Sequence, residues 1–312
     1  MSARMHAVVQ SVFGGPETLE YATTGIPEPG PGQVLLREAG AGVNPGDAVL
    51  RSGRVPELVQ LPWTPGNDVA GVVERVGEGV TRFAPGDGVY GMLPVSRRGA
   101  YAEFTAAPAE ALAPAPGNLE LAAAAAVPLV AVTAWQALAV LAGVRPGDRA
   151  LIHAAAGGVG HVAVQLAKEL GAYVIGTART GRHELLRGLG ADELIDYTTT
   201  SFESAVAPVD TVLDLVGGSY GPRSLDVLRP GGLLVGASID PGTDERQAAE
   251  RGTRYAWVTA APSGELLERI TERIEAGRLR VLVQDTYPLS ETAEAHRVIE
   301  SGRTTGKLVL VP

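Results

Sequence analysis

The stretch Arg149-Ala-Leu-Ile-His-Ala-Ala-Ala-Gly-Gly-Val-Gly160 has the pattern of a buried strand, a glycine-rich turn and the start of a helix. A helix is expected from Val159 to Leu170 and a second strand over Tyr173–Thr177. This order is typical of a nucleotide-binding βαβ unit, in which a pyrophosphate lies against N–H groups at a helix N-terminus. The first glycine position of the fullest fingerprint holds Ala155. The candidate phosphate-binding residues are Gly157, Gly158, Val159 and Gly160.

The end of the second strand indicates which nucleotide binds. An NAD site usually has Asp or Glu about 20 residues past the turn, where it binds the ribose hydroxyls. Here that position holds Ala178, between Thr177 and Arg179, and Arg182 follows. Guanidinium groups bind phosphate, so Arg179 and Arg182 favour NADP(H) over NAD(H). Thr177 is included among the cofactor-binding candidates.

Further strands are expected at Val209–Leu215 and Gly232–Gly236, with helices between them, which predicts a doubly wound parallel sheet. The first third of the chain has a different pattern, of strands without intervening helices. Strand-like runs such as Val34–Glu38 and Val69–Val76 are separated there by Pro-Gly turns. The expected fold class is therefore α/β plus β.

Composition excludes several classes of protein. The net charge of −9 argues against a nucleic-acid partner, and the absence of cysteine removes disulfides and Cys-ligated zinc. The N-terminus has no apolar signal region, and the uncharged run Leu121–Val144 is rich in alanine, which predicts a buried helix and no membrane partner. A cytoplasmic location is expected.

Ordered motifs extend along nearly the whole chain. They include Gly42-Val-Asn-Pro-Gly-Asp47, Pro65-Gly-Asn-Asp-Val-Ala-Gly71, Leu189-Gly-Ala-Asp192 and Thr305-Gly-Lys-Leu-Val-Leu310. With these motifs the chain resembles the zinc-free, quinone oxidoreductase-like branch of the medium-chain dehydrogenase/reductase superfamily. The resemblance implies a GroES-like β-barrel catalytic domain and a Rossmann NADP-binding domain, to which residues 1–125 with 280–312 and residues 126–279 are respectively assigned. It also implies a return of the last strand to the catalytic domain, and a homodimer.

Other catalytic classes fit poorly. Zinc-dependent relatives place Cys and a His-Glu pair where this chain has Asn44 and Asn67-Asp68, and the five histidines are scattered, so no metal is expected. No tyrosine has a lysine four positions later, as short-chain reductases require.

The expected chemistry is hydride transfer from NADPH to a quinone or an α,β-unsaturated carbonyl, a small-molecule substrate. Asn44 is the first candidate to stabilise a developing oxyanion, although it could simply cap a turn before Pro45. The resemblance places Thr133 near the nicotinamide, where the alternative is an ordinary helix residue. Asp47 is expected to order its loop, and Val49 stands where relatives often have a tyrosine, so no proton donor is assigned.

The resemblance implies four more cofactor-binding residues. Tyr197 and Lys307 match residues near the adenosine 2′-phosphate, with an exposed surface position as the alternative for each. Val216 is expected to touch the cofactor through its backbone. Trp257 either lines the nicotinamide pocket or belongs to the core.

Two other functions remain open at this point. One is an enoyl-thioester or biosynthetic tailoring reductase, for which no basic patch specific to CoA or a carrier protein is evident. The other is a non-catalytic NADPH- or RNA-binding relative, which the negative net charge disfavours in its RNA-binding form.

Overall fold

The computed structural model describes residues 3–97 and 99–312, and the chain divides into two compact units. The first unit comprises Met1–Val132 and Ala261–Pro312, and the second comprises Thr133–Ala260. Helix α9 (Gly264–Glu275), which the sequence analysis assigned to the nucleotide-binding domain, packs here against β7 (Leu112–Pro114) of the first unit.

A seven-stranded sheet organises the first unit. Its order is β14-β15-β3-β4-β5-β7, and β6 pairs with β3. The final strand β15 runs antiparallel to β3, which confirms that the end of the chain returns to this domain. Strands β1 and β2 form a separate antiparallel pair. The strands are β1 (Arg4–Gln10), β2 (Leu19–Gly25), β3 (Gln33–Val43), β4 (Asp68–Val76), β5 (Gly88–Met92), β6 (Phe104–Pro108), β7 (Leu112–Pro114), β14 (Val283–Pro288) and β15 (Lys307–Val311).

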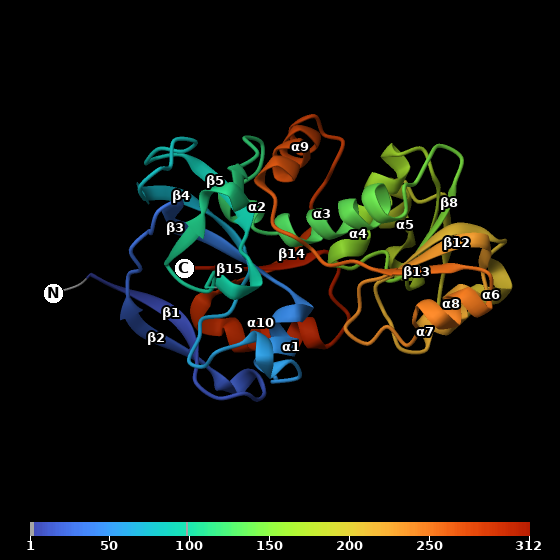
Figure 1. Cartoon of the computed structure of the whole chain (residues 1–312), viewed down its shortest axis with the longest axis horizontal. Helices are drawn as coiled ribbons and strands as arrows, with labels where there is room; N and C mark the ends of the chain where they lie inside the picture. The colour runs from blue at the N-terminus through green and yellow to red at the C-terminus, as the bar shows by residue number, and fades with distance from the viewer. Residues whose placement is uncertain (1–2, 98) are drawn as a thin grey trace. The chain divides into compact units, whose positions relative to one another are not determined.

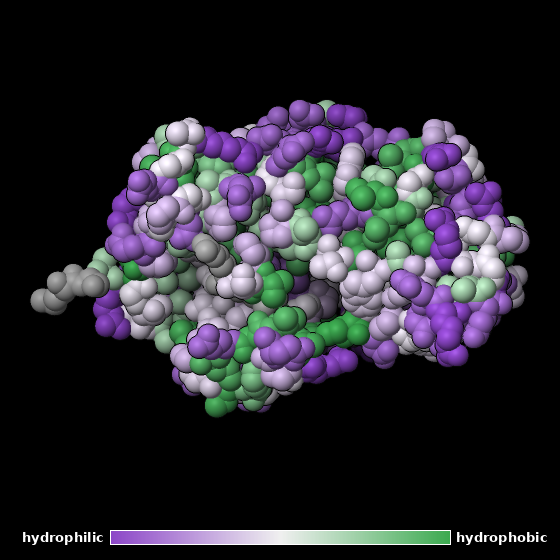
Figure 2. Space-filling view, in the orientation of Figure 1, coloured by the Kyte–Doolittle hydropathy of each residue, from purple (hydrophilic) through white to green (hydrophobic). Residues whose placement is uncertain are grey.

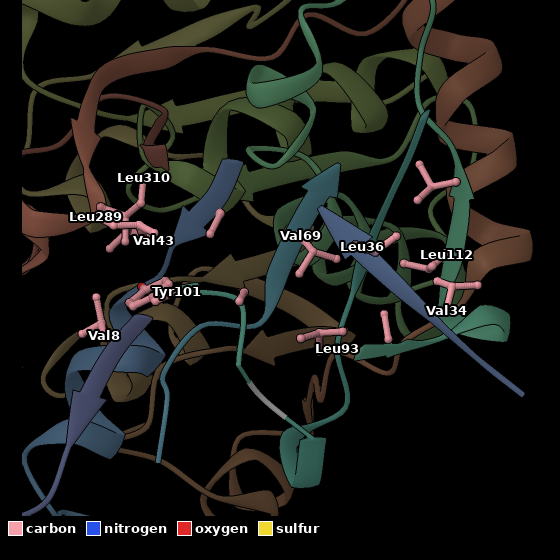
Figure 3. Packing of buried hydrophobic residues seen from close by; sticks show 14 of the residues in the cluster. Val8, Val34, Leu36, Val43, Val69, Leu93, Tyr101, Leu112, Leu289 and Leu310 are labelled. Atoms are coloured by element: carbon pink, nitrogen blue, oxygen red, sulfur yellow. The ribbon is translucent and has the colours of Figure 1, made fainter. Parts of the chain in front are cut away.

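The core of this unit is built from the inward-facing residues of these strands. Val34 and Leu36 of β3 alternate along one face and pack with residues of neighbouring strands, as Figure 3 shows. Helices α9 and α10 (Thr292–Glu300) pack against strands of this sheet, and α1 (Pro45–Arg51) packs against α10. Helix α9 buries Leu267, Ile270 and Ile274, while its charged residues give the mostly hydrophilic upper edge in Figure 2.

The second unit contains a six-stranded parallel sheet of order β10-β9-β8-β11-β12-β13. The order reverses between β8 and β11, so right-handed connections place α4 and α5 on one face and α7 and α8 on the other, as Figure 1 shows. This confirms the doubly wound Rossmann prediction. The strands are β8 (Arg149–Ile152), β9 (Tyr173–Thr177), β10 (Glu193–Ile195), β11 (Val209–Asp214), β12 (Leu228–Gly236) and β13 (Arg254–Trp257). The helices are α4 (Gly158–Glu169), α5 (His183–Gly188), α6 (Phe202–Ala205), α7 (Tyr220–Leu225) and α8 (Glu245–Glu250).

The long apolar run forms consecutive helical segments rather than one regular helix. These are α2 (Leu121–Ala124), α3 (Pro128–Trp135) and a π-helical segment over Gln136–Leu141. Among the described residues, Leu121–Leu141 is the stretch whose length and composition would allow it to cross a membrane, and 67% of its apolar window is buried inside the protein. Core helices of soluble proteins meet the same criteria, and the burial agrees with the prediction of a buried segment.

Candidate cofactor site and buried polar network

The glycine-rich turn of the second unit leaves the start of α4 open to an anion. Helix α4 begins at Gly158, and no side chain of the described residues caps its first N–H groups. These groups need an acceptor and carry the positive end of the helix dipole. A Cβ on Gly160 would lie 2.2 Å from the Ala154 carbonyl oxygen, whereas one on Gly157 would meet only that oxygen, at 3.2 Å. Gly160 is therefore required for packing and Gly157 keeps the approach clear, so the turn fits a pyrophosphate.

A buried histidine, His153, lies next to this turn and contacts two hydroxyl groups. His153 Nδ1 lies 3.2 Å from Thr177 Oγ1, and His153 Nε2 lies 3.0 Å from Ser224 Oγ. The N–H of Ala154, which has a positive φ of 48°, donates to Thr177 Oγ1. Burial lowers the pKa of His153 to about 3, so the ring is neutral near pH 7. Thr177 is 1% exposed and braces the turn through its side chain.

Two loops bring Arg179 and Tyr197 together at the ends of β9 and β10. Arg179 Nε donates to Tyr197 Oη over 3.2 Å, and both side chains are exposed. Asp196 joins the loops, because its carboxylate accepts hydrogen bonds from the backbone and hydroxyl of both Thr180 and Thr198. The hydrogen bonds from Thr180, followed by those from Thr198, hold the pKa of Asp196 below its usual range. Arg182 is exposed at the end of the same loop.

Two more candidate cofactor-binding residues belong to this unit: Val216 follows β11, and Trp257 is the last residue of β13. Val216 is 42% exposed, and its N–H donates to Asp214 Oδ1 over 2.9 Å, so this amide is engaged within its own loop. Trp257 is 40% exposed at the carboxyl end of β13, so it is not a core residue. Ligands of doubly wound sheets bind at the carboxyl ends of the strands, where both residues lie.

In the first unit, Asn44 lies at the N-terminus of α1 and Asp47 orders the turn. Asp47 Oδ2 accepts from the Asn44 N–H and from Tyr101 Oη, each over 2.9 Å. Asp47 Oδ1 is buried and has no hydrogen-bond partner among the described residues. Burial raises the pKa of Asp47 to about 6, despite the hydrogen bond from Tyr101. The contacts are those expected of a loop-ordering residue.

Asn44 also belongs to a buried polar triangle with Asp68 and Lys307, which are 2%, 0% and 2% exposed. Lys307 Nζ donates to Asn44 Oδ1 over 2.5 Å, to Val43 O over 2.9 Å and to Asp68 Oδ2 over 3.2 Å. Asn44 Nδ2 donates to Asp68 Oδ2 over 2.9 Å and makes a longer contact of 3.4 Å with Gly42 O. Asp68 Oδ1 accepts from the backbone N–H of Leu129 over 2.7 Å.

This triangle bears on two of the candidate residues, Lys307 and Asn44. Lys307, expected beside the 2′-phosphate or on the surface, is instead buried in the first unit with its three N–H donors in use, which leaves none for a phosphate. The second N–H of Asn44 makes the long hydrogen bond of 3.4 Å to Gly42 O. Thr133 is 6% exposed on α3, and its place near the nicotinamide stays a prediction.

The donor set does not fit zinc. Within residues 3–97 and 99–312, no group of three or more His, Cys, Asp or Glu side chains could hold a metal ion. Asn44 and Asp68, at positions where zinc-dependent relatives place ligands, hold an ammonium group instead.

Sequence reasoning missed several residues that shape the site. Asp196 had a usable signal, since threonines at 198, 199 and 200 follow it and Asp in such a setting often caps a turn. The pairing of Asp68 with Lys307 had none, because the two lie 239 residues apart. The contacts of His153 with Thr177 and Ser224 likewise depend on tertiary packing.

Two family models match the chain. Residues 30–117 match the alcohol dehydrogenase GroES-like domain, and residues 189–310 match a model described as zinc-binding dehydrogenase. Although the second family is called zinc-binding, residues 3–97 and 99–312 of this chain do not form a zinc site.

Individual proteins with similar sequences and structures agree with these matches. The 2-haloacrylate reductase of Burkholderia sp is 36% identical, over 96% of this chain and 96% of that protein. The solved quinone oxidoreductase of Coxiella burnetii has a TM-score of 0.95 and 34% identity, covering 99% of this chain and 100% of that one. A mycobacterial protein solved in complex with NADPH has a TM-score of 0.90 and 32% identity, covering 99% and 100%.

The family, its oxidoreductase members and the open glycine turn agree on an enzyme that uses a nicotinamide cofactor. The protein is therefore an NAD(P)H-dependent oxidoreductase. The chain belongs to the medium-chain dehydrogenase/reductase superfamily, in its quinone oxidoreductase-like branch.

Proposed function

We propose that this protein transfers hydride from NADPH to a quinone or an α,β-unsaturated carbonyl, without a metal. The observation that carries the cofactor assignment is the uncapped start of α4 beside an exposed arginine pair at the end of β9. The names of two relatives, a quinone oxidoreductase and a 2-haloacrylate reductase, support an electron-poor double bond as the acceptor. NADPH supplies the hydride, and the residues of this chain hold it and exclude water.

The preference for a phosphorylated nucleotide rests on charge. Among the described residues, the Arg179 guanidinium has one hydrogen bond, through Nε, which leaves its terminal nitrogens for a phosphate. Arg182 follows on the same exposed loop. The nearby carboxylate of Asp196 is occupied by Thr180 and Thr198, so its oxygens are already satisfied by donors other than a ribose.

The substrate oxygen needs an electrophile as hydride arrives. We assign this role to the remaining N–H of Asn44, because its amide already has a fixed orientation and one proton without a short bond. Thr133 is proposed to orient the nicotinamide. The incoming proton is assigned to no side chain.

The test measures NADPH and NADH oxidation against quinones, enones and enoyl thioesters. Arg179→Asp should raise KM for NADPH by about 10- to 100-fold, the cost of a lost charge-assisted contact plus repulsion, while KM for NADH changes less than about threefold. Arg187→Asp, on the exposed side of α5, makes the same change of charge and is the control. Equal effects of Arg179→Asp on both cofactors, or a preference of the unmodified enzyme for NADH, would contradict the NADPH assignment.

A further inference from the structure

We propose that Lys307 is a positioning residue whose ammonium group acts as a built-in cation that holds the Asn44 carboxamide in its working orientation. The inference rests on the proposed function, in which Asn44 faces the substrate oxygen. It concerns the polar triangle of Asn44, Asp68 and Lys307, all of them buried.

The triangle permits one orientation of the amide. Asn44 Oδ1 faces the Lys307 ammonium, and Asn44 Nδ2 faces Asp68 Oδ2. Rotating the amide by half a turn would set its oxygen against the carboxylate and its NH2 against the ammonium, so both contacts would become repulsive. In the held orientation the second N–H, rather than the oxygen, is the group an oxyanion would meet, and the oxyanion would replace the long 3.4 Å hydrogen bond from Asn44 Nδ2 to Gly42 O.

The ammonium is fully satisfied where it lies. Its three donors meet one oxygen each from Val43, Asn44 and Asp68, which belong to β3, the start of α1 and β4. The lysine comes from β15, whose Leu308 pairs with Val43, so the strand register fixes the base of the side chain. A buried ion pair seldom adds much stability over an apolar pair of the same shape, but it can impose one arrangement. Orientation of Asn44 is the arrangement that this one imposes.

A purely structural role makes different predictions, and two variants separate the alternatives. Lys307→Met leaves Asp68 buried without its cation, so it should lower both Tm and kcat. Lys307→Met combined with Asp68→Asn removes both charges. It should recover most of the lost Tm, yet kcat should stay about 100-fold low, the effect of losing one oxyanion donor, with KM for NADPH within about twofold. Recovery of kcat together with Tm would overturn the proposal.

The dependence on Asn44 has its own control. In an Asn44→Ala background, Lys307→Met with Asp68→Asn should lower kcat no further, since the residue through which Lys307 acts is gone. A further loss as large as that in the unmodified background would show that Lys307 acts by another route.

A readout on the unmodified protein needs neither turnover nor a variant that folds. In 15N-labelled protein the Asn44 side-chain amide and the Lys307 ammonium should both give resolved resonances with slowed hydrogen exchange, because each is buried and bonded. Exchange of both groups at the rate of exposed side chains would refute the fixed triangle. If the enzyme instead oxidises NADPH with none of the acceptors while these signals are protected, the proposed function fails and the triangle stands.

Discussion

Replacing Gly157 with alanine should separate cofactor binding from folding. The new Cβ would meet only the Ala154 oxygen, at 3.2 Å, and the backbone φ of −76° suits alanine. Loss of glycine at the helix N-cap costs about 1 kcal/mol, and the smaller entropy of the unfolded chain returns about 0.4–1 kcal/mol. We therefore expect Tm to change by less than about 3 °C. The methyl group would, however, stand where the phosphate approaches.

Loss of one charge-assisted contact costs about 1.5–3 kcal/mol, so the Kd for NADPH of Gly157→Ala should rise about 10- to 100-fold, measured by calorimetric titration. Gly160→Ala is the contrasting variant: its Cβ would meet backbone atoms at 2.2 and 2.8 Å, and overpacking of this kind costs about 1–3 kcal/mol, so Tm should fall. Gly188→Ala, where nothing lies within 4 Å, should bind NADPH normally. If Gly157→Ala keeps both its Tm and its affinity for NADPH, the turn is not the phosphate site.

Two more predictions concern buried charge in the first unit. The pKa of Asp47 is raised from 3.8 to about 6, so the stability that its protonated form provides is complete below pH 3.8 and is lost as pH rises through 6, by about 3 kcal/mol. Asp47→Asn should flatten this part of the profile of Tm against pH between 4 and 8, and an unchanged slope would contradict the assignment. Glu300→Gln weakens the two hydrogen bonds from buried Arg51 to the Glu300 carboxylate. The free energy of unfolding, measured in urea, should fall by about 2 kcal/mol. Glu294→Gln, on the exposed side of the same helix, should cost less than about 0.5 kcal/mol, and similar losses in both variants would refute the distinction.

The sequence predicted the regular parts of the nucleotide-binding unit closely. Strand β9 occupies the expected residues, Tyr173–Thr177, and α4 begins one residue before the expected Val159. Local periodicity suffices there, because β9 is buried over Val174–Thr177 and α4 has an apolar, buried face. The apolar run from Leu121 was expected as one helix, but it is interrupted before Pro128, whose ring removes an N–H donor.

The candidate site likewise has parts that could be predicted from the sequence and parts that could not. The glycine turn and the meeting of Arg179 with Tyr197 follow from strand ends that a parallel sheet brings to one edge. The burial of Lys307 could not be read from its neighbours, because lysine is ordinarily exposed and the acceptors that compensate its burial lie on other strands. A motif can thus identify an important lysine without showing what it binds.

The pairing of β15 with β3 also bears on how the protein acquires its activity. Lys307 meets Val43 across 264 residues of sequence, so the first unit stays incomplete until β15 has been synthesised. The second unit is contiguous in sequence and can fold earlier during translation. Before β15 docks, Asp68 and Asn44 lack the ammonium group that contacts both of them. Under the roles proposed for the glycine turn and for Asn44, a nascent chain should bind nucleotide before β15 docks and should gain activity only afterwards.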